Sequence, residues 1–207
     1  DVEPVFDEIL RSVQHLFDVE DRVIFRIHGD LLHIAAVDGP NADAVRRLFP
    51  VPLRGTTTDE AIRERRLVSY DDVLNGEGVP DGLRAVAARF GYSYSIATAP
   101  LLAGDRAIGS LVVARVNMKP FAEDERLLLQ TLADQAVIAI QNARLFTETR
   151  EALERQTATS DILNVIASSP TDTRPVFEAI ASRAKSLVGG FSSTVFRFID
   201  GQAYLEA

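Results

Sequence analysis

YSYSIATAPLLAGDRAIGSLVVARV, residues 92–116, contains two apolar runs that meet at Gly104-Asp105. Both runs are rich in β-branched and aromatic residues, which pack well on the pleated surface of a sheet. A Gly-Asp pair between such runs is a turn signal, because these residues accept the positive φ angles of tight hairpin turns. The stretch therefore predicts an antiparallel hairpin with strands at 92–103 and 106–116.

The same pattern occurs near the start of the chain. Apolar runs at 22–28 and 31–37 flank Gly29-Asp30, which predicts a second hairpin. A further short strand is expected at 67–70, and we expect about six strands in total. Because hairpins join antiparallel neighbours, the sheet should be largely antiparallel.

Helical segments alternate with these strands. The first has an apolar stripe at helical spacing and Pro4 in its first turn, and the last is followed by Gly91, a residue suited to a helix C-terminus. This order predicts an α+β fold in which helices cover both faces of a central sheet. The expected helices span 3–17, 41–50, 58–65 and 82–90, and Asn41 is expected to cap the second of them.

Residues 121–169 contain neither Gly nor Pro, which predicts one long helix that leaves the domain. Its first half is apolar enough to pack on the sheet and on a neighbouring helix. Its middle is charged, and Phe146 and Leu153 form only a weak heptad pattern. A break near Ser160, which could cap a new helix, is the alternative to a continuous helix.

The chain also repeats itself at the scale of a domain. Residues 172–207 align with residues 1–36 without a gap, and nine of the 36 positions are identical. Solenoid units have periods of up to about 50 residues, so this offset of 171 is too long for one. We predict a first domain at 1–146, a helical connector at 147–171, and the start of a second copy at 172–207, which is truncated.

Composition narrows the classes of function. The net charge is −8, and the best candidate for a basic cluster, residues 63–66, lies at a predicted helix end, where cations also match the helix dipole, so nucleic acid is not expected as a partner. The absence of cysteine excludes disulfides, thiolate metal sites, a cysteine nucleophile and a thioether-linked bilin. No apolar run approaches 18 residues and no signal peptide is visible, so we expect no membrane contact and a cytoplasmic location.

Three stretches carry a resemblance to a known family. Residues 99–113 resemble the paired central strands of GAF domains, and residues 121–145 resemble that family's C-terminal helix. Residues 55–71 resemble its helix-then-strand segment, so that the resemblance covers 3–146 in order. The connector and restart at 156–172 look like the joint between successive GAF domains in bacterial multidomain sensor histidine kinases.

The resemblance implies a small-molecule pocket between the sheet and the middle helices and loops, with the loop at 71–82 as a lid. Each candidate also has a purely structural reading: a helix cap for the threonines, a turn for Asp71, ordinary strand positions for the tyrosines. The candidate ligand-binding residues are Thr56, Thr57, Thr58, Tyr70, Asp71, Tyr92, Tyr94 and Arg106.

The sequence disfavours a metal, haem, cyclic-nucleotide or catalytic site. His28 and His33 straddle a turn without a third ligand, so a metal or haem site is not expected. Lys119, Phe121 and Asp124-Glu125 resemble a motif of cyclic-nucleotide GAF domains, but the spacing departs from it and the acids also suit a helix start. No arrangement of nucleophile and base is present, so we expect no enzymatic activity in these residues.

Taken together, these features favour a regulatory sensory module of a bacterial signalling protein, expected to be a sensor histidine kinase. It would bind a small molecule and relay that event through its terminal helices, and we expect a homodimer through the N- and C-terminal helices. The alternative is a dimerisation spacer without a ligand, whose pocket is filled by its own side chains, in a kinase or nucleotide cyclase. The identity of the ligand or cofactor stays open.

Overall fold

A computed structural model describes residues 2–168 and 173–207. The chain divides into two compact units, Asp1–Arg144 and Leu145–Ala207. The first unit contains the sheet and all of the predicted site residues, and each unit is described by itself below.

The first unit is built on a six-stranded sheet in the order β3-β2-β1-β6-β5-β4. Every neighbouring pair is antiparallel, which confirms the predicted sheet and both hairpins. The strands are β1 (Asp21–His28), β2 (Leu31–Asp38), β3 (Val51–Pro52), β4 (Val68–Tyr70), β5 (Ser95–Ala103) and β6 (Arg106–Arg115).

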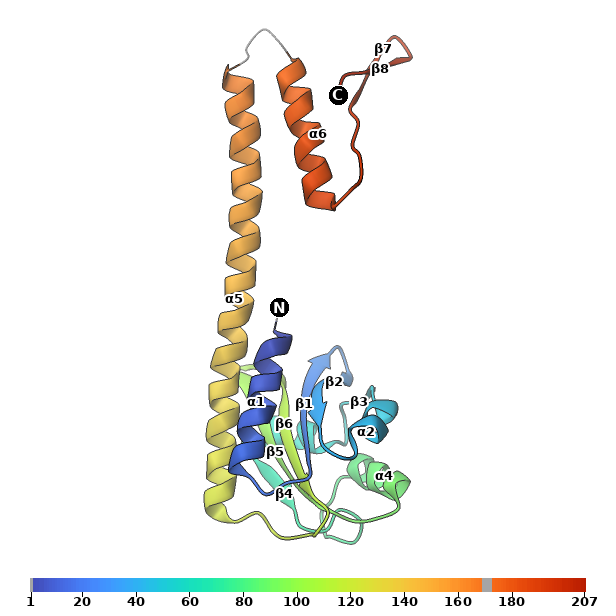
Figure 1. The fold of residues 1–207 in the computed structure, drawn as a ribbon. Helices are drawn as coiled ribbons and strands as arrows, with labels where there is room; N and C mark the ends of the chain where they lie inside the picture. Colours follow the sequence, from blue (N-terminus) through green and yellow to red (C-terminus); the bar gives the residue numbers. More distant parts are fainter. Residues whose placement is uncertain (1, 169–172) are drawn as a thin grey trace. The chain divides into compact units, whose positions relative to one another are not determined.

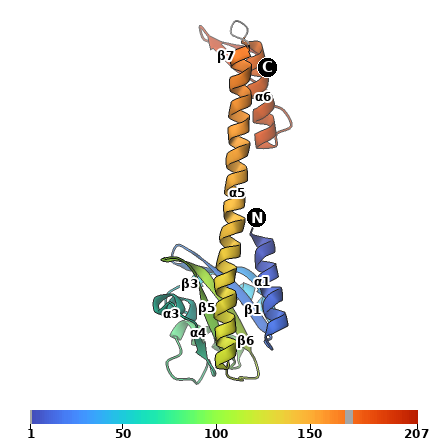
Figure 2. The same ribbon diagram turned by 90° about the vertical axis from the view of Figure 1, so that its left-hand side faces the viewer.

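Helices cover both faces of this sheet, as predicted for the α+β class. Figure 1 shows α1 and the first turns of α5 on one side of the strands and α2 and α4 on the other. In the view turned by 90°, α3 and α4 lie to the left and α1 lies to the right (Figure 2). The helices of this unit are α1 (Glu3–Leu16), α2 (Ala42–Leu48), α3 (Thr57–Glu64), α4 (Asp81–Phe90) and α5 (Glu123–Ser168), which continues into the second unit.

Two separate apolar cores result, one on each face. The first core joins α1, the sheet and α5, with Val13, Leu111 and Leu129 fully buried. The second lies under α2 and α4 and includes Phe25, Leu83 and Tyr94. Burial of this apolar surface on both faces is the main stabilising contribution to the unit.

Strand β6 supplies side chains to both cores because successive residues of a strand point to opposite faces. Leu111 and Val113 belong to the core beneath α1 and α5. Val112 and Ala114 pack in the core on the opposite face. The two sides of the sheet therefore meet in the backbone of this strand.

Three local predictions differ from the structure. The strand expected from Tyr92 begins at Ser95, because the carbonyl of Tyr94 accepts a hydrogen bond from the N–H of Val73 (3.1 Å) in the preceding loop. The helix expected from Phe121 begins at Glu123. β3 was not predicted, since two residues carry no periodicity.

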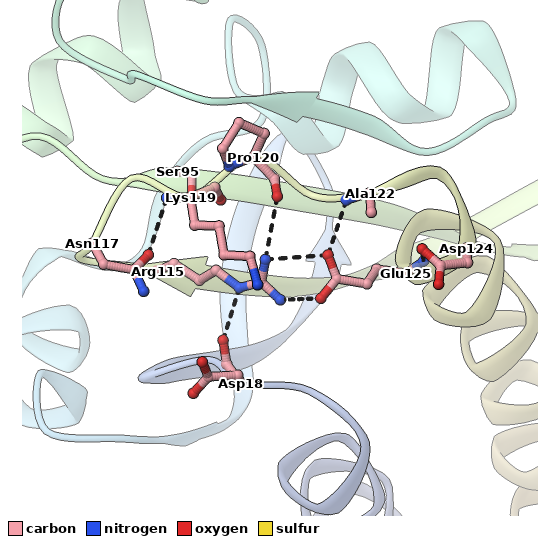
Figure 3. A network of polar contacts seen from close by, with 9 residues as sticks. All are labelled: Asp18, Ser95, Arg115, Asn117, Lys119, Pro120, Ala122, Asp124 and Glu125. Atoms are coloured by element: carbon pink, nitrogen blue, oxygen red, sulfur yellow. Dashed lines mark hydrogen bonds and ion pairs between the residues drawn. The ribbon is translucent and has the colours of Figure 1, made fainter.

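The start of α5 is fixed by Arg115, the last residue of β6, whose side chain is fully buried. Its polar contacts are shown in Figure 3. Its Nε donates to the carbonyl oxygen of Asp18 (2.7 Å), and its other nitrogens bind both carboxylate oxygens of Glu125. The guanidinium also lies over the ring of Phe121, 4.2 Å from its centroid. One cation thus joins the α1–β1 loop, β6 and α5.

Glu125, in the first turn of α5, binds Arg115 and also the backbone at the start of the helix. Its Oε2 accepts a hydrogen bond from the N–H of Ala122 (2.9 Å), and its bond to Arg115 holds the pKa of this carboxyl below its usual value. Because the pKa is lower in the folded state, the pair stabilises the fold above the ordinary glutamate pKa. That stabilisation is lost as the pH falls through the lowered value.

Replacing Arg115 by alanine should lower the free energy of unfolding by about 3 kcal/mol, because removal of one partner leaves buried acceptors unpaired. Urea unfolding measures the loss. Arg11→Ala is the matched control: Arg11 pairs with Glu8 on the exposed surface of α1, so its loss should cost at most about 1 kcal/mol. Equal effects of the two substitutions would contradict the role given to Arg115.

The second unit contains the remainder of α5 with α6 (Arg174–Val188), β7 (Phe196–Ile199) and β8 (Gln202–Leu205). α5 runs without a break past Ser160, as the continuous-helix prediction requires. The predicted end of the connector at 169–171, and Asp172 with it, lie outside the described residues.

The hairpin β7–β8 has the same register as β1–β2 at the offset of the repeat. Phe196 pairs with Leu205 and Phe25 with Ile34, which are equivalent positions in the alignment. Every residue of β7 and β8 is exposed, whereas four of the eight residues of β1 are buried. That residues 172–207 begin a second copy stays a prediction, and this shared register supports it.

Candidate functional site

A cavity of about 350 Å³ lies in the first unit, between the sheet face opposite α1 and the helices α2 and α4. Val23, Ile96 and Val112 line it from the strands, and Leu83 and Val86 line it from α4. The wall is predominantly apolar, and polar side chains gather at few points. The polar lining residues are Asp21, Asn41, Arg54, Thr56, Thr57, Thr58, Arg89, Tyr92 and Tyr94.

Five of the eight predicted site residues line this cavity: Thr56, Thr57, Thr58, Tyr92 and Tyr94. Their binding of a ligand stays a prediction, but the fold brings them together around one space. They come from the start of α3 and from the segment before β5, which are distant in sequence and adjacent in the fold.

The other three predicted residues lie outside the lining. The Tyr70 hydroxyl donates to Glu60 Oε2 (2.6 Å) on α3, so this ring is held by the helix beside it. Asp71 and Arg106 are exposed on the surface. Arg106 follows the β5–β6 turn directly, and a turn between strands keeps it away from the cavity wall.

The predicted lid contributes little to the cavity. Of residues 71–82 only Gly82 lines it. The loop is instead anchored by Asp72, whose Oδ1 accepts from the Ser93 hydroxyl and from the N–H groups of Leu74 (3.2 Å) and Asn75 (3.0 Å). These hydrogen bonds lower the pKa of Asp72 to about 2, and the bond from Ser93 has the largest effect.

Two of the threonines already have buried hydroxyl partners. Thr58 Oγ1 is 2.8 Å from Ser110 Oγ on β6, and Thr98 Oγ1 on β5 donates to Thr57 Oγ1 (2.9 Å). Thr56 caps α3, since its hydroxyl oxygen accepts from the N–H of Asp59 (3.2 Å). The helix-cap reading therefore holds for Thr56 alone, whereas Thr57 and Thr58 fasten α3 to the sheet.

Aromatic rings form two groups along the cavity wall. Phe25 and Phe49 lie 4.6 Å apart between centroids. Phe90, Tyr92 and Tyr94 form the second group at 6.0–6.4 Å. Such faces suit a planar or apolar ligand, because offset and edge-on ring contacts stabilise more than area alone.

The two tyrosines are hydrogen-bond donors at neutral pH. Burial raises the pKa of the Tyr94 phenol, and burial followed by the nearby Asp21 carboxylate raises the pKa of Tyr92. Tyr92 also shares a hydrogen bond with the side chain of Asn41. Neither phenol is therefore a candidate base.

One end of the cavity is a polar cluster that the sequence did not reveal. Asn41 donates to both carboxylate oxygens of Asp21, through its N–H (3.0 Å) and its Nδ2 (2.6 Å). The prediction of Asn41 as a helix cap is wrong in this respect: it precedes α2 without a capping bond, because its amide binds Asp21 instead. Tyr92 completes this cluster.

Two lining arginines were also missed. Arg54 lies two residues before Thr56, the cap of α3, and Arg89 lies in the last turn of α4. Both are exposed, and within the described part of the chain neither guanidinium has a hydrogen-bond or ion-pair partner. Their sequence context gave no signal, because an arginine beside a glycine or at a helix end is usually on the surface.

The histidine and motif residues lie elsewhere. The rings of His28 and His33 are 6.0 Å apart, and neither lines the cavity. Lys119, Asp124 and Glu125 belong to the joint between β6 and α5 (Figure 3). Phe121 packs in the core beneath α1 and α5, and none of these four residues lines the cavity. Across residues 2–168 and 173–207, no group of three His, Asp or Glu side chains is placed to hold a metal ion.

A comparison with family models matches residues 1–140 to the GAF domain. The chain belongs to the GAF domain family. The match ends within α5, so the family accounts for the sheet, both helical layers and the cavity of the first unit.

Solved GAF domains have the same fold. The GAF domain/HD domain protein from Geobacter sulfurreducens is 18% identical, with a TM-score of 0.60 over 70% of this chain and 95% of that one. The GAF-B domain of DevS from Mycobacterium smegmatis is 22% identical, with a TM-score of 0.58 over 72% and 99%. The GAF domain of a two-component sensor histidine kinase from Bacillus halodurans is 14% identical, with a TM-score of 0.56 over 71% of this chain and 98% of that one. At these identities the similarity shows the fold.

Among the helices in residues 2–168 and 173–207 of this GAF protein, none combines the length and the apolar character that crossing a membrane requires.

The Thr58–Ser110 pair distinguishes a structural from a ligand-binding role in this GAF domain. Thr58→Val should cost about 1–3 kcal/mol of unfolding free energy, because it leaves the buried Ser110 hydroxyl without a partner. Adding Ser110→Ala should restore much of the loss, since both polar groups are then gone. Chemical denaturation of the single and double variants measures this. A single variant as stable as the parent chain would refute the structural role.

Proposed function

We propose that the first unit is a cytoplasmic regulatory sensor that binds a small molecule in the cavity beneath α2 and α4. The observation that carries this proposal is the cavity itself, whose volume of about 350 Å³ lies within the range of small-molecule sites. Its wall is apolar and aromatic with a few convergent polar groups, which is the usual composition of such sites. A spacer filled by its own side chains would leave no such space beside Tyr92 and Tyr94.

The route from the cavity to the output runs through β6. Val112, Ala114 and Val116 contact the cavity, while Val113 and Arg115 contact the core and the start of α5 on the other face. A ligand that shifts the backbone of β6 therefore acts on the Arg115–Glu125 joint. Such a shift requires that the ligand bind one arrangement of α5 more tightly than another.

The relay we propose serves a bacterial sensor histidine kinase. The GAF domain of the Bacillus halodurans kinase shares the fold, and α5 leaves the domain without a break as a helix that could transmit a shift of about 1–2 Å. No evident nucleophile and base meet in the cavity, so the proposed role of these residues is binding and not turnover.

Filling the cavity should abolish ligand binding without unfolding the domain. A metabolite library is screened by thermal shift on the 207-residue chain; a ligand present at 100 times its Kd should raise the Tm by about 5–10 °C. Ala114→Phe directs a ring into the cavity and should remove that shift, because Ala114 lines it on β6.

Ala122→Phe is the matched control, since Ala122 is exposed and lies outside the cavity lining. It should keep the ligand-induced shift. A library that never raises the Tm of the parent chain would favour the ligand-free spacer, and a shift retained in a folded Ala114→Phe variant would place binding elsewhere.

We further propose that the module forms a parallel homodimer along α5. In the first unit, Ile138 of α5 is 59% exposed. In the second unit, Leu145 and Phe146 are 59% and 72% exposed, and Leu153 follows Phe146 by one heptad. Large apolar side chains at heptad spacing favour association with a second helix of the same kind.

The double substitution Leu145→Glu and Phe146→Glu should convert a dimer into a monomer, because it places two like charges per chain into the apolar contact. Multi-angle light scattering gives the mass. Glu151→Lys, on another face of α5, is the control and should leave the dimer intact. A parent chain that is already monomeric, or a double variant of unchanged mass, would reject this interface.

A further inference from the structure

The charges on the cavity wall differ in sign from the rest of the molecule. Its charged lining residues are Arg54, Arg89 and Asp21, so the lining carries a net charge of +1 in a chain of net charge −8. Both carboxylate oxygens of Asp21 are already bound by Asn41. The two guanidinium groups are thus the charges still free to interact with a ligand.

The two arginines stand at different ends of the cavity. The N–H of Leu53, next to Arg54, donates to the carbonyl of Asp30 (2.9 Å) in the β1–β2 turn. Asp21 begins β1 and so lies at the opposite end of that strand, which spans roughly 25 Å for eight residues at about 3.3 Å each. Arg54 therefore lies far from the acidic group of the lining.

Arg89 belongs to the other end. The residue after it, Phe90, lies 6.0 Å from the ring of Tyr92, which in turn joins the cluster of Asn41 and Asp21. Arg89 therefore lies at the end of the cavity that also holds the Asp21 carboxylate. Arg54 has no ion-pair partner among the described residues, and the two acids in the first turn of α3 are already engaged, Asp59 by Arg63 (3.8 Å) and Glu60 by the Tyr70 hydroxyl (2.6 Å).

We infer that the ligand of this cavity is an apolar or aromatic carboxylic acid, whose body packs between the two aromatic groups and whose carboxylate pairs with Arg54. This inference rests on the proposed sensor function and specifies its ligand class. An arginine binds a carboxylate through two parallel hydrogen bonds, and the unpaired guanidinium at the cavity rim is available for that geometry. A single carboxylate matches the one lining arginine that lies away from Asp21.

The test compares 4-phenylbutanoate with its neutral isostere 4-phenylbutanamide on the full chain by isothermal titration calorimetry. The acid should bind about tenfold more tightly than the amide, as expected for one charge-assisted contact. Arg54→Gln should abolish this preference. Arg89→Gln, which also removes an exposed and unpaired arginine from the lining, should retain it.

Each other outcome overturns the inference in a recognisable way. Equal binding of acid and amide, blocked in both cases by Ala114→Phe, would remove the carboxylate class and leave the proposed sensor cavity standing. A preference lost in Arg89→Gln but kept in Arg54→Gln would overturn the assignment to Arg54. No binding of the acid, the amide or neutral butylbenzene would overturn the ligand class, and the library screen then judges the sensor function separately.

Discussion

The structure depends on the alternation of side chains along β6. Leu111, Val113 and Arg115 point toward α1 and α5, whereas Val112 and Ala114 point toward the cavity. This constraint follows from the strand geometry itself, in which neighbouring residues face opposite sides of the sheet. Both apolar cores and the buried cation at the start of α5 are positioned by it. A rearrangement on one face of β6 therefore reaches the other face through a backbone that they share.

Most of the fold could be predicted because its signals are local. The Gly-Asp pairs at Gly29 and Gly104 sit at the turns of the two hairpins, and Gly91 ends α4 with a positive φ of 78°. The segment without glycine or proline became one helix from Glu123 to Ser168. The predictions that failed concerned a very short element and a tertiary contact. β3 has only two residues, and the Asn41 side chain binds Asp21, 20 residues away, instead of capping α2. Local preference yields where a buried partner is available.

The site was predicted less completely than the fold. Thr56 to Thr58 and the two tyrosines were expected from the resemblance, and they line the cavity. Tyr70 was expected there too, but its hydroxyl is held by Glu60. Arg54 and Arg89 were not predicted, because an unpaired cation on a cavity rim has no characteristic sequence pattern. Their place in the lining follows only from how the α3 and α4 segments pack around the same cavity. Recognition chemistry of this kind is a property of the assembled wall.

The division of β6 also bears on how such a module can diversify. Positions that face the cavity can change while those that face α5 stay constant, since the two sets never occupy the same residue. A new chemical preference could then arise by substitution at Val112 or Ala114 without rebuilding the attachment of Arg115 to Glu125. For protein engineering, the same separation offers a scaffold in which the input is exchanged and the transmission to α5 is inherited unchanged.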